Sequence, residues 1–101
     1  MAKTTLTHEQ EKALKAGGFQ ADFPEWAHEN AHIVRAFFSS ADAVAQYRAY
    51  YSARTITEHL RHESIVRDKG SEWKINNNRT PDLARLYEAV RRNGLFSFRG
   101  R

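Results

Sequence analysis

Two stretches of the chain hold side chains whose types and spacing could do chemistry. The first is "HENAH", from His28 to His32, which matches the pattern H-E-x-x-H. On a continuous helix the two histidines project to one side and can bind zinc, while Glu29 activates a water molecule. A zinc hydrolase also needs a third ligand, for which the available sources are Glu58, His59, His62 and Glu63. Five histidines in 101 residues make a chance match common, so surface histidines without a metal are the simpler interpretation.

The second stretch is a cluster of basic and amide side chains near the C-terminus. The residues that we assign to a nucleic-acid or partner site are Lys74, Asn76, Asn77, Asn78, Arg79, Arg85, Arg91, Arg92 and Arg99. Arginine and asparagine make bidentate contacts with guanine and adenine edges, and amides at a helix start can hold a phosphate. Residues 51–101 carry eleven Lys/Arg against six Asp/Glu, whereas residues 1–50 carry five against six. This asymmetry favours an anionic partner, and a merely solvated basic face is the equal alternative.

Aromatic residues lie among these charges. They are Trp73, Tyr87, Phe96 and Phe98. An exposed member of this set could stack on a nucleic-acid base. Large aromatic side chains in a small domain are mostly needed for the core, and this is the interpretation that we favour here.

Composition excludes several other classes of protein. The chain has no cysteine, which excludes a disulfide framework and a thiolate zinc site. It contains no apolar run of about 20 residues that could span a membrane, and its N-terminus lacks the apolar stretch of a secretory signal. Phosphate-binding glycine loops and a nucleophile elbow are also absent. We therefore expect a cytoplasmic protein with no cofactor and no catalytic activity.

The elements that must position these residues are mainly helical. Thr7 and Gln10 form a capping box, and a short helix is expected from there to Gly17-Gly18. Its apolar residues are few, so residues 1–22 are expected to be a loosely attached helix and connector. Two adjacent apolar stripes predict a central helix from Pro24 to about Tyr50, with a bend where "SSAD" offers a new cap.

The C-terminal half is expected to combine two further helices with two short strands. Ser52 caps a helix that runs to about Arg67, with Ile56 and Leu60 facing inward. The alternating stretches "EWKIN" (72–76) and "LFSFR" (95–99) are predicted to pair as strands. Between them the asparagines turn the chain, Thr80 acts as an N-cap, and Pro81 begins a helix. Its buried stripe is Leu83, Leu86, Tyr87 and Val90.

The predicted fold class is mainly α (α+β). The chain is expected to form one domain of four or five helices, with a small two-stranded β element near the C-terminus.

A long part of the chain, from Phe23 to Arg99, resembles a family of small phage and prophage proteins. The shared features are an aromatic-Ser-Ala-x-x-Ile helix start, a "[FW]-K-[IL]-N-[ND]" strand, an "x-x-A-R-x-[FY]" helix and a Phe-rich end with arginine. The matching positions are Tyr51, Ser52, Ala53, Ile56, Trp73, Lys74, Ile75, Asn76, Asn77, Ala84, Arg85 and Tyr87. The resemblance implies a phage or prophage product that acts in the bacterial cytoplasm, and it implies no particular activity.

Three functions follow in order of preference. The first is binding of DNA or RNA through the basic C-terminal strand–helix–strand face, without catalysis. The second is a phage effector that binds and inhibits a host protein, such as a CRISPR or restriction nuclease complex. The third is the minimal zinc hydrolase. Association with a membrane is not expected, and a homodimer is left open.

Overall fold

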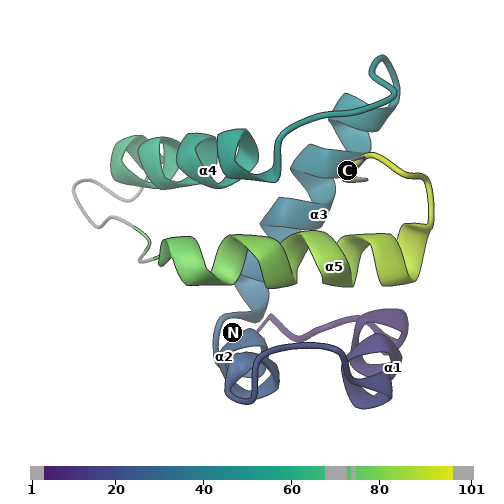
Figure 1. Ribbon diagram of the computed structural model, residues 1–101. Coiled ribbons are helices and arrows are strands. Elements are labelled where there is room, and N and C mark those ends of the chain that lie inside the picture. Colours follow the sequence, from purple (N-terminus) through teal and green to yellow (C-terminus); the bar gives the residue numbers. More distant parts are fainter. Residues whose placement is uncertain (1–3, 68–72, 74, 97–101) are drawn as a thin grey trace.

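Helix α5 (Thr80–Arg91), the last one in the described part of the chain, is the helix against which α1, α3 and α4 all pack. The computed structural model describes residues 4–67, 73 and 75–96. In chain order its elements are α1 (His8–Ala16), α2 (Phe23–Glu29), α3 (Ala31–Ala45), α4 (Ala53–Arg67), the short 3-10 helix η1 (Asn77–Arg79) and α5 (Thr80–Arg91). Figure 1 shows α4 antiparallel to α5 on one side, with α1 and α2 on the opposite side. The described residues form one compact all-α domain, with a radius of gyration of 13.3 Å.

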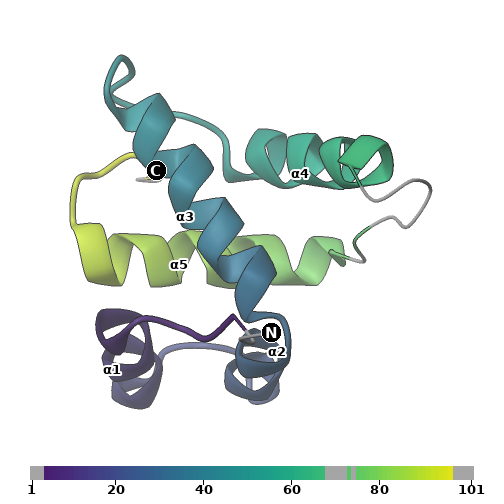
Figure 2. The ribbon, with the colours of Figure 1, turned by 180° about the vertical axis from the view of Figure 1, so that it is seen from behind.

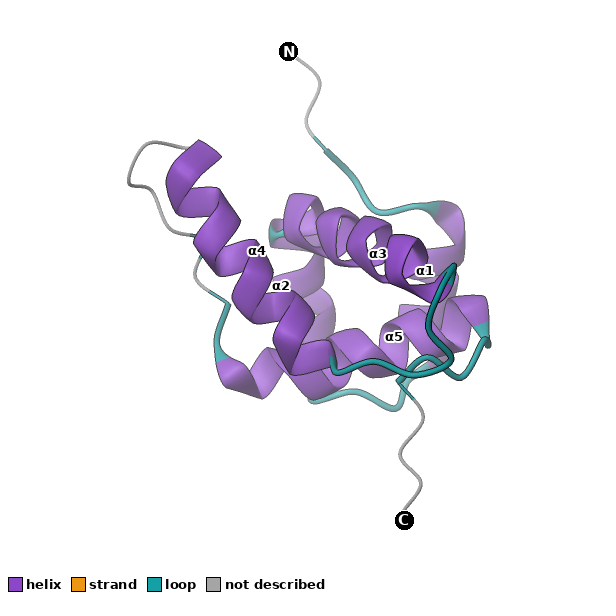
Figure 3. Cartoon of the chain, turned by 90° about the horizontal axis from the view of Figure 1, so that it is seen from above, coloured by secondary structure: helices purple, strands orange, loops and turns teal. Residues whose placement is uncertain are grey.

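The long helix α3 ties these layers together. Seen from behind in Figure 2, α3 runs diagonally across α5 and passes beside the start of α4, and its own start adjoins α2. The view from above in Figure 3 shows the helices surrounding a common interior. Every α-helix contributes to one apolar cluster in that interior. Its largest fully buried members are Tyr87, Phe23, Phe37, Ile33, Leu83 and Leu86.

Several local predictions are confirmed. The capping box is present, because Thr7 Oγ1 accepts a hydrogen bond from Gln10 N at 3.1 Å and Gln10 Oε1 accepts one from Thr7 N at 2.9 Å. Gly17 follows α1 with φ of +90°, a backbone conformation that favours glycine. Ser52 caps α4, since its Oγ accepts a hydrogen bond from Thr55 N at 3.2 Å. α1 also lies against α5, with Leu14 buried, a contact that the sequence did not predict.

The central helical segment breaks at a different place from the one predicted. The break falls at Asn30, which has φ of −122° and ψ of 41°. Its backbone N–H and its side-chain Nδ2 both donate to the carbonyl oxygen of Trp26, at 2.8 and 3.0 Å. A side-chain amide that competes for a helix carbonyl in this way interrupts the helical ladder. The predicted bend at Ser39–Asp42 is wrong, because α3 continues to Ala45 and keeps its apolar face in the core.

The predicted β element is also wrong in the part of the chain that the structure describes, which contains no strand. Asn76 caps η1, and the carbonyl of Ile75 accepts a hydrogen bond from the Arg61 side chain. Phe96 N donates to Glu88 Oε2 at 2.9 Å, so a side chain satisfies a backbone group that a strand would pair. The rest of the two predicted strands, at 72, 74 and 97–99, lies outside the described residues.

The start of α5 differs from the prediction by one residue. Thr80 is the first helical residue, and Arg79 is at the N-cap without a side-chain capping bond. The Thr80 hydroxyl instead lies 3.3 Å from the Thr57 hydroxyl of α4. Pro81 and Asp82 are in the first turn, as predicted. None of the helices in the described ranges is long and apolar enough to cross a membrane.

Candidate functional site

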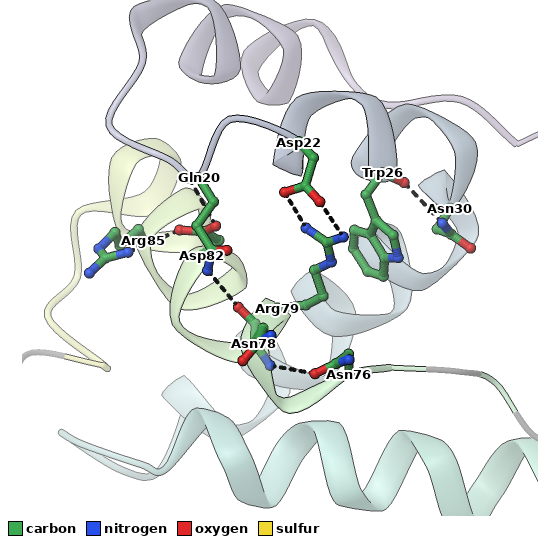
Figure 4. A network of polar contacts seen from close by, with 9 residues as sticks. All are labelled: Gln20, Asp22, Trp26, Asn30, Asn76, Asn78, Arg79, Asp82 and Arg85. Carbon is green, nitrogen blue, oxygen red and sulfur yellow. Dashed lines mark hydrogen bonds and ion pairs between the residues drawn. The ribbon is translucent and has the colours of Figure 1, made fainter.

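The three asparagines build the turn that leads into α5. Asn76 Oδ1 accepts a hydrogen bond from Asn78 N at 2.9 Å, and the Asn76 carbonyl accepts one from Arg79 N at 2.9 Å. The Asn78 carbonyl in turn accepts a hydrogen bond from Gln20 Nε2 at 3.0 Å (Figure 4). Local backbone chemistry therefore accounts for Asn76 and Asn78, whereas the exposed side chain of Asn77 takes no part in these bonds.

Arg79 is committed to an ion pair within the fold. Its two terminal nitrogens bind the two carboxylate oxygens of Asp22, each at 3.0 Å, and its guanidinium lies 5.4 Å from the ring centre of Trp26 (Figure 4). The hydrogen bonds from Arg79 lower the pKa of Asp22, although burial opposes the shift, and the pKa of Arg79 is raised. The Arg79 side chain is only 16% exposed. It fastens the connector before α2 to the start of α5.

Arg85 also has a carboxylate partner. Asp82, which is completely buried, accepts hydrogen bonds from Arg85 Nη1 at 2.9 Å and from the backbone N–H of Gln20 at 3.2 Å (Figure 4). A carboxylate in the first turn of α5 also interacts favourably with the helix dipole. The Arg85 side chain itself is 58% exposed. It therefore lies between Asp82 and the solvent and is not part of the buried core.

Arg91 belongs to a second network at the other end of α5. Its guanidinium binds both carboxylate oxygens of Asp42, each at 3.0 Å, and lies 5.3 Å from the ring centre of Phe38. The Tyr87 hydroxyl donates to Asp42 Oδ1 at 2.8 Å and accepts from Asn93 Nδ2 at 3.0 Å. Burial raises the pKa of Asp42, but the hydrogen bonds from Arg91 and Tyr87 outweigh it, so this pKa lies below its usual value. Burial, with the bond to Asp42, raises the pKa of Tyr87 to about 12.

The residues assigned to a binding face from the sequence therefore do not form one free cationic surface. Three of the arginines each hold an aspartate from another part of the fold or from the same helix turn. Arg92, in a left-handed conformation with φ of 54°, is exposed and lines a cleft between α1 and α5 of about 460 Å³, together with Lys12 and Glu9. Lys74 and Arg99 lie outside the described residues.

The histidines of "HENAH" are placed on two different helices by the break at Asn30. His28 Nδ1 lies 2.9 Å from the carbonyl of Pro24, and His28 Nε2 lies 4.0 Å from a Glu11 carboxylate oxygen. His32, on α3, forms a T-shaped ring contact with Trp73, with the two ring centres 5.2 Å apart. Across the described ranges, no three His, Asp or Glu side chains form a group that could hold a metal ion.

A surface that the sequence reasoning missed is the connection between α3 and α4, residues 46–52, which we call the tyrosine loop. Figures 1 and 2 show it projecting beyond the helical body. Tyr47 is 81% exposed and Tyr50 is 59% exposed. The signal is present in the sequence, because residues 43–57 contain three tyrosines, Arg48 and Arg54 but no Asp or Glu. Near the end of the loop, the backbone N–H of Tyr51 donates to the carbonyl of Leu95 at 2.9 Å.

Two hollows adjoin the end of the tyrosine loop, and Tyr51 lines both. The α3–α4 cleft, of about 330 Å³, is lined by Ser40, Ala43, Val44, Tyr51, Thr55, Ile56 and His59. The α4–α5 groove, of about 360 Å³, is lined by Tyr51, Ser52, Ala53, Arg54, Thr80, Pro81, Ala84 and Phe96. A further hollow of about 250 Å³ shares Arg54, Thr80 and Pro81 with the groove and is bounded by Asn77. Asn77 is thus a member of the predicted site that faces an open hollow, as Arg92 is at the α1–α5 cleft.

Comparisons with known proteins add nothing to this description, which therefore rests on the structure of this chain alone. No family model matches the sequence, and no curated protein and no solved structure matches it significantly.

Proposed function

We propose that the protein is a non-catalytic nucleic-acid-binding protein and that it contacts nucleic acid through the tyrosine loop. The observation that carries the proposal is the exposure of Tyr47 and Tyr50 beside Arg48, in a stretch without carboxylates. Exposed aromatic rings next to arginine suit a nucleic acid, since bases stack on the rings and phosphates pair with the guanidinium. The net charge of +4 adds a general attraction for a polyanion.

In this proposal the C-terminal arginines stabilise the fold and are not the main contacts with nucleic acid. Arg79 and Arg91 are each bound to both oxygens of an aspartate, and Arg85 covers a buried one. A direct contact with a base edge would require these pairs to open. Their bidentate geometry favours a structural function, whereas Arg48 lies on a loop that carries no competing carboxylate.

The cellular context is also a proposal, and it rests on the resemblance to phage and prophage proteins. A small accessory protein of this kind would act in the cytoplasm of the bacterial host, where both DNA and RNA are accessible.

The proposal is tested by fluorescence anisotropy with labelled single-stranded and duplex DNA at low and moderate salt. Tyr47→Ala should weaken binding about 5- to 150-fold, because stacking on one aromatic ring contributes about 1–3 kcal/mol per base. Arg48→Gln should make the affinity less dependent on the salt concentration. The matched control Lys15→Gln removes the same charge from α1 and should change neither the affinity much nor the stability. Equal affinity of Tyr47→Ala and the parent protein would contradict the proposal.

A host protein is the second candidate partner, and the α3–α4 cleft is the observation that favours it. This cleft places Ala43, Val44 and Ile56 beside Tyr51, and tyrosine and arginine are enriched among the residues that dominate protein interfaces. An effector that inhibits a nuclease complex could bind in this way. Absence of DNA and RNA binding at low salt, together with specific capture of a host protein that Tyr47→Ala abolishes, would favour this function over the first.

A further inference from the structure

We propose that the α4–α5 groove holds one unpaired nucleotide, so that the protein binds single-stranded nucleic acid in preference to duplex. This inference rests on the proposed function and adds a site and a strand preference to it. A nucleotide joins a flat, weakly polar base to a charged phosphate. The groove is its apolar counterpart and can take the base, whereas the junction with the adjoining hollow is polar and can take the phosphate.

The apolar part is the groove itself. Ala84 and Phe96, which are 1% and 3% exposed, lie at its base, while Pro81 and the partly buried Tyr51 form its sides. These side chains lie on α5, near the end of the tyrosine loop and on the turn after α5, and three of the four are buried or partly buried, so the groove is largely pre-formed. Its volume of about 360 Å³ lies at the small end of the range typical of small-molecule sites.

The polar part is at the junction with the adjoining hollow. Arg54 and Thr80 line both spaces, and the exposed amide of Asn77 bounds the outer one. Arg54 is 71% exposed and forms an i,i+4 pair with Glu58 at 3.1 Å. An exposed pair of this kind contributes little, so Arg54 can exchange its carboxylate partner for a phosphate. No carboxylate is among the described residues that line the groove or the hollow.

The groove is continuous with the tyrosine loop. Tyr51, near the end of the loop, lines the groove, and the hydrogen bond from its backbone N–H to the carbonyl of Leu95 holds this corner in place. A single strand whose bases stack on the exposed tyrosines can therefore place its next nucleotide in the groove. Bases of a duplex are paired and stacked, so they can enter such a space only after unpairing, which costs free energy.

The experiment is an NMR titration of the uniformly ¹⁵N-labelled full chain, with anisotropy measured on the same probes. The probes are a thymidine oligonucleotide of about ten residues, a length within the usual site sizes of single-strand binders, and a blunt-ended duplex of about ten base pairs without unpaired nucleotides. We expect the amides of Arg54, Asn77 and Ala84 to shift with the single strand at concentrations where the duplex leaves them unchanged. Arg54→Gln should lower the slope of log affinity against log salt by about 0.7, the value for one phosphate contact on a single strand. Lys15→Gln should leave this slope unchanged.

The outcomes separate this inference from the proposed function. If the single strand binds and Tyr47→Ala weakens it, but the groove amides do not shift, the nucleotide site is refuted and the tyrosine loop stands. If the duplex binds as tightly and shifts the same amides, the strand preference is refuted. If neither probe binds at low salt, the inference and the proposed function both fail. Arg54 is an exposed residue, so a folded Arg54→Gln variant is expected, and Asn77→Ala provides a second test of the polar part.

Discussion

Replacement of Tyr87 by phenylalanine should show that the network at the end of α5 stabilises the fold. The Tyr87 side chain is completely buried, and its hydroxyl donates to Asp42 at 2.8 Å while accepting from Asn93 at 3.0 Å. Phenylalanine keeps the ring, which packs at 5.1 Å from Phe38 and 5.2 Å from Phe96. The variant therefore removes the two hydrogen bonds and leaves the apolar core unchanged.

The expected cost follows from how far water can replace the lost partner. A hydrogen bond to a charged group contributes about 1.5–3 kcal/mol when both partners are shielded from water. The Asp42 side chain is 42% exposed and retains Arg91, so water and the guanidinium recover part of this value. We expect Tyr87→Phe to lower the free energy of unfolding by about 1 kcal/mol, which corresponds to a loss of about 4–8 °C in Tm for a domain of this size.

The assay is urea denaturation followed by circular dichroism, at neutral pH and in acid. The control is Tyr47→Phe, which removes the same hydroxyl from an 81% exposed side chain and should leave the midpoint unchanged. Because the folded pKa of Asp42 is lowered, the stability from its ionised form is complete above the unfolded value of about 3.9 and is lost as pH falls through the folded value. The difference between Tyr87→Phe and the parent protein should therefore shrink in acid. Equal urea midpoints for Tyr87→Phe and Tyr47→Phe at pH 7 would refute this account of the network.

Three further results are expected. The pKa of Tyr87 is raised to about 12, so the stability due to its protonated hydroxyl is complete below the unfolded value of about 10 and is lost as pH rises through about 12. In an absorbance titration of the tyrosines, the step near pH 12 should therefore be absent from Tyr87→Phe. Retention of that step would assign it to another tyrosine. Thr7→Ala should lower the free energy of unfolding by about 1 kcal/mol in urea denaturation through loss of the N-cap, whereas Thr4→Ala, at an exposed position, should not, and equal effects would argue against the cap. Metal analysis of the purified protein should find no stoichiometric zinc, since His28 and His32 are on separate helices, and zinc that His32→Ala removes would contradict this.

Much of the candidate site could not be predicted, because the residues next to an arginine in the sequence do not reveal which side chains lie around it in the fold. Arg79 and Arg91 were assigned to a binding face from their types and positions. Their aspartate partners are 57 and 49 residues away along the chain. Only packing of α2 and α3 against α5 brings these pairs together. The tyrosine loop was detectable from its composition, but its exposure depended on where α3 ends and α4 begins.

The sequence by itself determined the features that depend on contacts within about one helical turn. These are the cap at Thr7, the end of α1 at the glycines, the cap at Ser52, and the buried positions of α5 such as Leu83 and Leu86. Propensity, capping and the 3.6-residue period act over a few residues, so the local sequence contains all the partners that they need.

Tertiary structure alone decided the rest. It replaced the expected β pairing at Phe96 with a hydrogen bond to Glu88, and it used the buried Asp82 to hold the backbone of Gln20, 62 residues away. It also set α4 beside α5 so that a groove opens next to Tyr51. The physical reason is that a polar group takes whichever partner the packed core leaves within reach, and burial of the apolar faces, which dominates the free energy of folding, chooses that packing.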